Sequence, residues 1–404
     1  RILHRIADII ESRDDLLAEI ETWDSGLPIT QAKGQAQRAA ENFRFFADLI
    51  VAQHDNAFKV PGRQINYVNR KPIGVAGLIT PWNVPFMQES WKLAPALATG
   101  NTVVLKPAET TPLTALLFAD LLQQAELPPG VVNIVTGAGP TGAAVVGHPG
   151  VDKVAFTGST AVGKSIAKQI AGTRKHATLE LGGKAANIVF ADAPIDQAVE
   201  GIVNGIFFNQ GQVCCAGSRV LVEEPLHDEL VDRLKARLGT LRLGDPMDKN
   251  TDIGAINSAR QLERITDLSA AGEAEGAVRW SADCAIPESG FWFPPTVFTQ
   301  VSAAHRIARE EIFGPVLSVL TFRTPAEAVA KANNTPYGLS AGIWTEKGSR
   351  ILWMADRLRA GVVWANTFNK FDPTSPFGGY KESGYGREGG RQGLGPYLVE
   401  GDVR

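Results

Sequence analysis

The chain has 404 residues, 44% of them hydrophobic and 21% charged, with a formal net charge of −3. Such a composition is ordinary for a soluble globular protein of two or three domains. The charge gives no electrostatic preference for nucleic acid or a membrane surface, and no apolar run approaches the length of a membrane span. Three cysteines, two of them adjacent, make no disulfide framework and favour a reducing cytoplasm. The six histidines lack the spacing of zinc sites, so we expect no metal centre.

The first 55 residues predict helices, because apolar residues recur at helical spacing over 2–10 and 43–50, with a break at 26–28. Extended structure is expected near residues 56–70. From there strand and helix patterns alternate. Strands are predicted at 73–80, 101–105, 131–135, 154–156, 187–190, 220–222, 316–322, 341–345 and 361–365, and helices at 112–124, 161–170, 195–207, 228–238, 259–268 and 349–358. This alternation predicts parallel sheets built from βαβ units and covered on both faces. Residues 279–295 show no clear period and predict a surface connection in which Cys284 is structural.

Two cysteines, Cys214 and Cys215, lie on a glycine-rich connection between the helix predicted at 195–207 and the strand predicted at 220–222. Loops held by a rigid scaffold often carry catalytic groups, so one of these thiols is a candidate nucleophile. The alternative is that both are small buried hydrophobic residues. A thiol needs an activating partner, which must come from elsewhere in the chain.

Polar residues follow several predicted strands, where ligands of open α/β sheets bind. Asn83, between two prolines, could donate a hydrogen bond to an oxyanion, or could satisfy its own turn. Lys106 and Glu109 could hold ribose hydroxyls, or could form a solvated ion pair. Gly158 and Ser159 open a helix whose N-terminus could bind phosphate, although Ser159 could simply cap that helix.

Glu180 stands among apolar residues beside a glycine pair. Burial would raise the pKa of its carboxyl group and make it a plausible general base. The alternative is a structural glutamate paired with Lys184.

Seven motifs in this order resemble the NAD(P)-dependent aldehyde dehydrogenase superfamily, from residue 1 nearly to residue 404. They are Pro81-Trp82-Asn83, Lys106-Pro107-Ala108-Glu109, Phe156-Thr157-Gly158-Ser159, residues 179–184, Asn209-Gln210-Gly211-Gln212 with Cys214, residues 311–315 and residues 375–381. The resemblance implies an α/β protein with two doubly wound Rossmann-like domains and a small oligomerisation β element. We expect an NAD-binding domain at 1–182, interrupted at 54–72, a catalytic domain at 183–382, and a return segment with an oligomerisation strand at 383–404. Family members usually begin with further residues, so the start is expected to be truncated or disordered, or to lack the first strands.

The catalytic roles that the resemblance implies fall on three residues. Cys214 would attack the aldehyde, and the Asn83 amide with the Cys214 backbone N–H would stabilise the oxyanion. After hydride transfer to the nicotinamide, Glu180 would activate water to hydrolyse the thioester. The expected cofactor-binding residues are Trp82, Lys106, Glu109, Gly158, Ser159, Glu311 and Phe313.

The resemblance also bears on the choice of cofactor, substrate and assembly. Glu109 at the ribose hydroxyls would repel a 2′-phosphate, so we predict NAD over NADP, with NADP possible. The matching tunnel positions predict an apolar or aromatic aldehyde, and none is an arginine that could hold a substrate carboxylate. They are Val84, Trp91, Phe208, Phe371 and Phe377. Segments 56–70 and 397–400 resemble oligomerisation strands and predict a homodimer or homotetramer.

Other readings remain open at this point. Relatives that pass the acyl group to CoA typically lack the glutamate at the Glu180 position, and the same residue counts against a reductase of activated acids. A non-catalytic structural or binding protein could retain the fold, but such relatives lose the nucleophile or its helpers.

Overall fold

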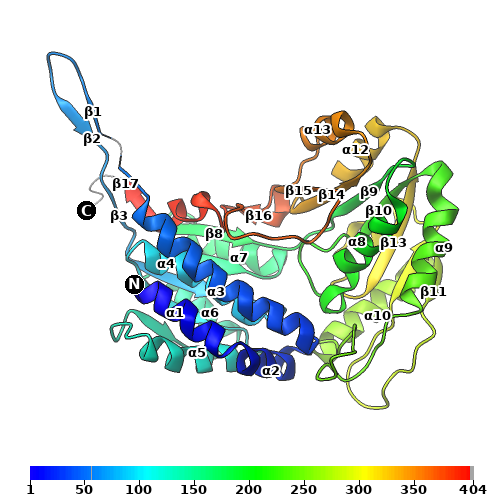
Figure 1. Cartoon of the computed structure of the whole chain (residues 1–404), viewed down its shortest axis with the longest axis horizontal. Helices are drawn as coiled ribbons and strands as arrows, with labels where there is room; N and C mark the ends of the chain where they lie inside the picture. The colour runs from blue at the N-terminus through cyan, green and yellow to red at the C-terminus, as the bar shows by residue number, and fades with distance from the viewer. Residues whose placement is uncertain (56, 401–404) are drawn as a thin grey trace.

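The structure, a computed structural model, describes residues 1–55 and 57–400. Two central sheets, each flanked by helices, lie side by side, and a thin hairpin projects from one of them (Figure 1). None of the helices in the described part combines the length and the hydrophobicity that a membrane crossing requires. The predicted α/β fold with two doubly wound parallel sheets is confirmed.

Three helices open the chain: α1 (Ile2–Ser12), α2 (Asp14–Ser25) and α3 (Ile29–Val51). The break predicted at 26–28 is confirmed, since Gly26 ends α2 with a left-handed φ of 81°. Helices α1 and α3 pack on each other and on α4 (Pro85–Ala98), and they bury Phe43 and Phe46 completely. These helices cover one face of the first sheet.

The first sheet has six strands in the order β16-β8-β7-β4-β5-β6, all parallel except β16. Short runs of apolar residues form them because both faces are covered by helices. The strands are β4 (Val75–Ile79), β5 (Thr102–Lys106), β6 (Val132–Ile134), β7 (Lys153–Thr157), β8 (His176–Glu180) and β16 (Gly384–Tyr385). The remaining helices of this half are α5 (Leu113–Gln124), α6 (Gly139–Gly147) and α7 (Thr160–Ile170).

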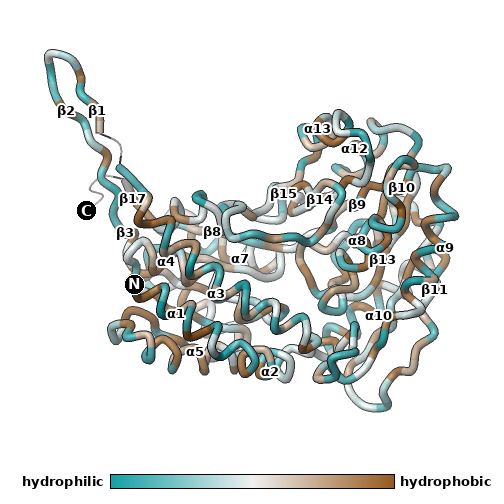
Figure 2. The backbone as a smooth tube through the Cα atoms, in the orientation of Figure 1, coloured by the Kyte–Doolittle hydropathy of each residue, from teal (hydrophilic) through white to brown (hydrophobic). Residues whose placement is uncertain are grey.

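The second sheet has seven strands in the order β11-β12-β13-β10-β9-β14-β15, with only β11 antiparallel to its neighbour. They are β9 (Ala186–Val189), β10 (Arg219–Glu223), β11 (Val278–Ser281), β12 (Thr296–Thr299), β13 (Val316–Phe322), β14 (Ser340–Trp344) and β15 (Val362–Ala365). The helices are α8 (Ile195–Phe207), α9 (His227–Leu238), α10 (Ala259–Ala274), α11 (Arg306–Arg309), α12 (Pro325–Asn333) and α13 (Gly348–Ala355). In Figure 2 the central strands of this sheet and helix α5 are mostly hydrophobic.

The surface connection predicted at 279–295 is wrong at its start, where residues up to Ser281 belong to β11. This edge strand is at most half-buried, so it lacks the apolar alternation that would have revealed it. Cys284 lies in the irregular segment that follows β11.

A hairpin of β1 (Ala57–Lys59) and β2 (Ile65–Tyr67) projects from the body in Figure 1. Beside the hairpin, β3 (Arg70–Pro72) pairs with β17 (Leu398–Glu400), the last described strand. Because β3 directly precedes β4, this pairing places β17 next to the first sheet. The extended structure expected near 56–70 is therefore confirmed for the described residues. The domain limits at 182/183 and 382/383 stay predictions.

Candidate active site

The first sheet gathers four of the predicted residues along one edge. Strands β8, β7, β4 and β5 are parallel neighbours, so their carboxyl ends lie side by side. Glu180 ends β8, Gly158 follows β7, Trp82 follows β4 and Lys106 ends β5. The Gly158 N–H donates to the Glu180 carbonyl oxygen at 3.0 Å, which fixes the two strand ends to each other.

The other side of the candidate site comes from the second sheet, at the amino ends of β9, β10 and β13. Gly183 precedes β9, Cys214 precedes β10 and Glu311 precedes β13. The Gly183 N–H donates to Glu311 Oε1 at 2.9 Å. A Cβ on Gly183 would overlap the carbonyl oxygen of Cys214, so only glycine permits this approach.

The turn before Cys214 has an uncommon backbone. Asn209, Gln210 and Gly211 have φ values of 49°, 54° and 72°, which places three successive residues in the left-handed region. Asn209 and Gln210 are buried, and a Cβ on Gly211 would overlap the backbone of Gly314. Backbone strain of this kind persists where the surroundings enforce it, and it often marks functional sites.

Asn83 is fixed to this turn. Its side-chain Nδ2 donates to the Gln212 carbonyl oxygen at 2.8 Å, and its own carbonyl oxygen accepts from Asn209 Nδ2 at 2.6 Å. The side chain therefore does not satisfy its own turn. A carboxamide NH₂ carries two donors, so the second N–H of Asn83 is left for another acceptor.

Cys214 and Cys215 have different surroundings. Cys215 is buried, with its Sγ 3.9 Å from Asn369 Oδ1, whereas Cys214 is partly exposed. The hydrogen bond with Cys215 and then burial raise the pKa of the Cys214 thiol well above its usual value. Cys214, the residue that the resemblance selected, is thus the less buried of the pair.

Glu180 is a buried carboxyl group whose two oxygens have no hydrogen-bond partner among the described residues. The alternative of a pair with Lys184 is wrong, since Lys184 Nζ is also without a partner there. Burial first, and then the charge of Glu388, raise the pKa of Glu180 well above its usual value. An ionised Cys214 would add to this increase, so the negative charges of the two candidate catalytic groups disfavour each other.

A buried ion pair near Glu180 escaped the sequence analysis. Lys92 Nζ contacts Glu388 Oε1, and the two side chains are 0% and 4% exposed. Lys92 lowers the pKa of Glu180 while Glu388 raises it. The two partners are 296 residues apart in the chain, and neither has a local motif, so no sequence signal joined them.

Two of the predicted cofactor residues, Lys106 and Ser159, have partners within the chain. Lys106 Nζ lies 3.4 Å from Glu109 Oε2, with the lysine buried and the glutamate exposed. Ser159 caps α7 by accepting the Val162 N–H at 3.4 Å, so the capping alternative is confirmed, and the helix N-terminus faces the same edge as the lysine. Figure 1 shows α7 beside β8.

The Trp82 and Phe313 rings meet edge to face with centroids 5.3 Å apart. Phe313 has a left-handed φ of 59°. Next to it lies the partly buried Glu311, and desolvation raises the pKa of its carboxyl group to about 7. A cavity of about 10 Å³ between Gly183, Glu311 and Phe313 leaves room there for about one water molecule.

The structure also brings the predicted tunnel residues together. Trp91 lies 5.2 Å from Phe377 and 6.0 Å from Phe371, and the two phenylalanine rings are 5.3 Å apart, between centroids. Val84 and Phe208 belong to the same hydrophobic cluster, which includes Cys214 at its margin.

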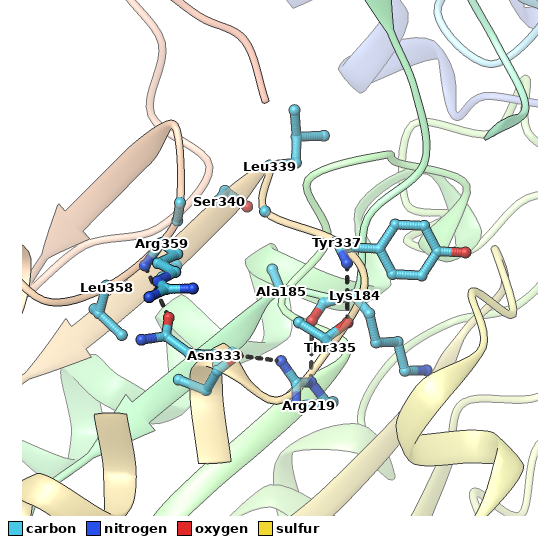
Figure 3. A pocket seen from close by; sticks show the side chains of 15 residues that line it. Lys184, Ala185, Arg219, Asn333, Thr335, Tyr337, Leu339, Ser340, Leu358 and Arg359 are labelled. Atoms are coloured by element: carbon cyan, nitrogen blue, oxygen red, sulfur yellow. Dashed lines mark hydrogen bonds between the residues drawn. The ribbon is translucent and has the colours of Figure 1, made fainter. Parts of the chain in front are cut away.

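A different pocket, of about 20 Å³, lies behind the link from β8 to β9 and contains none of the predicted site residues (Figure 3). Arg219 donates there to the carbonyl oxygens of Lys184 and Ala332, both at 3.0 Å. Ala332 belongs to the last turn of α12, so Arg219 joins the C-terminus of that helix by hydrogen bonds to the β8–β9 connection at Lys184. We therefore read this pocket as structural.

Comparisons with known proteins agree with this geometry. The profile of the aldehyde dehydrogenase family matches residues 1–400. The mitochondrial aldehyde dehydrogenase of Mesocricetus auratus is 45% identical over 400 residues, covering 98% of this chain and 80% of that protein. An NAD-dependent aldehyde dehydrogenase from Sinorhizobium meliloti is 43% identical with a TM-score of 0.97, covering 99% of this chain and 80% of that one. An indole-3-acetaldehyde dehydrogenase in complex with NAD⁺ is 42% identical with a TM-score of 0.97, covering 99% and 82%. The chain belongs to the aldehyde dehydrogenase family.

We expect Lys92→Met to lower the free energy of unfolding by about 3–5 kcal/mol, because it leaves the Glu388 charge buried without its partner. The double variant Lys92→Met/Glu388→Leu removes both charges and should recover most of that loss. Denaturant unfolding of the wild type, both single variants and the double variant measures these differences. A double variant as unstable as the sum of the single variants would show that the pair is not coupled.

Proposed function

We propose that the protein oxidises an aldehyde to the carboxylic acid, with Cys214 as the nucleophile and NAD as the cofactor. The observation that carries the proposal is the surroundings of Cys214. It is the less buried cysteine of the pair, its turn is held by Asn83, and an ionised Cys214 would raise the pKa of the unpaired carboxyl group of Glu180. A thiol, an amide donor and a buried carboxyl group are the set that acyl chemistry needs.

In the proposed reaction Cys214 loses its proton and its sulfur adds to the carbonyl carbon, forming a C–S bond. The free N–H of Asn83 and the Cys214 backbone N–H stabilise the resulting oxyanion. NAD, when bound, would supply the acceptor for the hydride of the thiohemiacetal. Loss of this hydride converts the thiohemiacetal into a thioester. Glu180 in its ionised form then takes a proton from water, the water oxygen attacks the thioester carbon, and the C–S bond breaks.

Transfer of the acyl group to CoA is the main alternative reaction. The unpaired oxygens of Glu180 favour hydrolysis, because a base for water requires a carboxylate whose lone pairs are not already engaged. A structural or binding protein without catalytic activity is the other alternative. The presence of Cys214, Glu180 and Asn83 together counts against it.

The substrate that we propose has an apolar or aromatic body. Trp91, Phe371 and Phe377 pack ring against ring at the predicted tunnel, and flat apolar groups fit such walls. The likeness to an indole-3-acetaldehyde dehydrogenase supports this choice.

The proposal is tested by NADH absorbance with NAD and a panel of aldehydes. We expect Cys214→Ala to lower turnover by at least about 10³-fold, because no other group can form the thioester. Glu180→Gln should release about one equivalent of NADH per subunit and then stall, since acylation needs no base for water. Cys215→Ala is the matched control and should retain most activity. Equal loss in both cysteine variants, or steady turnover in Glu180→Gln, would contradict the assigned roles.

We predict that kcat/KM with NAD exceeds that with NADP by about tenfold or more, because Glu109 would face a 2′-phosphate with a like charge. Glu109→Gln should reduce this ratio mainly through the KM for NADP. Initial rates with one aldehyde and each cofactor give both constants. A wild-type preference for NADP would overturn the assignment of Glu109.

The hairpin supports the proposal of a homodimer or homotetramer. Phe58, Ile65 and Tyr67 expose 56%, 69% and 75% of their surface on it, and exposed apolar edge strands call for a partner. Light scattering at micromolar concentration should therefore give two or four times the chain mass, and Ile65→Asp combined with Tyr67→Asp should shift it toward the monomer. A wild-type monomer would refute the proposal.

A further inference from the structure

Arg38, on helix α3, reaches the aromatic cluster of the tunnel. Its guanidinium carbon lies 4.7 Å from the centroid of the Phe371 ring. Phe371 in turn contacts Trp91 and Phe377. The sequence predicted α3 only as a core helix, so this cation was not among the tunnel positions considered.

The guanidinium has few partners for its donors. Nη1 donates to Gln35 Oε1 at 3.1 Å, and among the described residues no carboxylate forms an ion pair with Arg38 within 4.0 Å. On the same helix, Arg44 contacts Asp8 Oδ1 at 2.8 Å and two oxygens of Glu11. Arg38 thus keeps most of its five donors for another group, whereas Arg44 does not.

The charge of Arg38 is maintained in an apolar setting. Burial lowers the pKa of the guanidinium to about 10, so it remains protonated at neutral pH. The charges of Cys215 and of Glu41 act in the opposite direction and raise that pKa. A partly desolvated cation gains most from an anionic partner that enters the same space.

Phe371 fixes the orientation of this cation. A guanidinium stacked on a ring uses one face for that contact and presents its N–H edge sideways. Two parallel N–H donors match the two oxygens of a carboxylate. A ligand that packs on the Phe371 ring would therefore lie beside the guanidinium.

We propose that Arg38 binds a carboxylate at the far end of the substrate, so that the substrate is an aldehyde with a flat apolar body and an anionic end. This rests on the proposed dehydrogenase function and specifies its substrate class. It revises the expectation that no arginine holds a substrate carboxylate, because Arg38 enters the tunnel from a helix distant in sequence from the other wall residues.

The test compares aldehydes that differ only in the terminal charge. The probes are 4-formylbenzoate and 4-formylcinnamate, each against its methyl ester, assayed as NADH formation with wild type, Arg38→Gln, Arg38→Lys and the control Arg44→Gln. For at least one length, wild type should favour the acid over the ester by about 10- to 100-fold in kcat/KM. Arg38→Gln should abolish this preference through the KM of the acid, with ester kinetics unchanged. Arg38→Lys should retain part of it and Arg44→Gln all of it.

The result that overturns the proposal is a wild type that favours neither acid, or an Arg38→Gln that loses acid and ester turnover equally. If wild type oxidises no aldehyde, neither these nor those of the wider panel, the dehydrogenase function itself fails. The Arg38 site is then read from protection of Cys214 against iodoacetamide. Protection by an acid at about tenfold or lower concentration than by its ester, lost in Arg38→Gln, supports the site, and equal protection refutes it.

Discussion

The site depends on the two-glycine link that joins the two sheets. Gly182 and Gly183 connect the end of β8, where Glu180 lies, to the start of β9. A Cβ on Gly182 would overlap the Glu311 carboxylate, and a Cβ on Gly183 would overlap the Cys214 carbonyl oxygen. The absence of side chains therefore lets the link lie against the Cys214 and Glu311 segments, which precede β10 and β13. Every predicted catalytic residue lies on one side or the other of this contact.

The same contact buries charge at a considerable cost. Glu180 has two oxygens without partners, and the nearby Lys92 and Glu388 balance each other in a space that excludes water. Burial and the charge of Glu388 raise the pKa of Glu180 well above its usual value, and the hydrogen bond with Cys215 and burial do the same for the Cys214 thiol. Small changes in solvation shift the pKa values of buried groups most, so a bound ligand can change the ionisation of Cys214 and Glu180.

In the proposed substrate tunnel, aromatic rings and a cation lie on one wall. The rings of Trp91, Phe371 and Phe377 supply a flat surface, and Arg38 stacks on the outer one. The apolar wall orients a substrate body with little specificity of its own, while a cation in a poorly hydrated place discriminates by charge. Helix α3, which also packs against α1 and α4, thus links the core of the first half to the substrate path.

The sequence by itself determined the alternation of strands and helices, the position of the cysteine loop and the set of motifs that match the family, because these features are local. Residues 195–207 and 316–322 are a helix and a strand as their periodicity predicts. The edge strand β11 was missed, since pairing with β12 and not its own pattern makes it a strand. Only the tertiary structure decided which cysteine is the less buried, that Glu180 has no partner in Lys184, and that Lys92 and Glu388 meet across 296 residues. It alone placed Arg38 on Phe371. Burial and long-range contact control these properties, and neither can be read from residues that are neighbours in the chain.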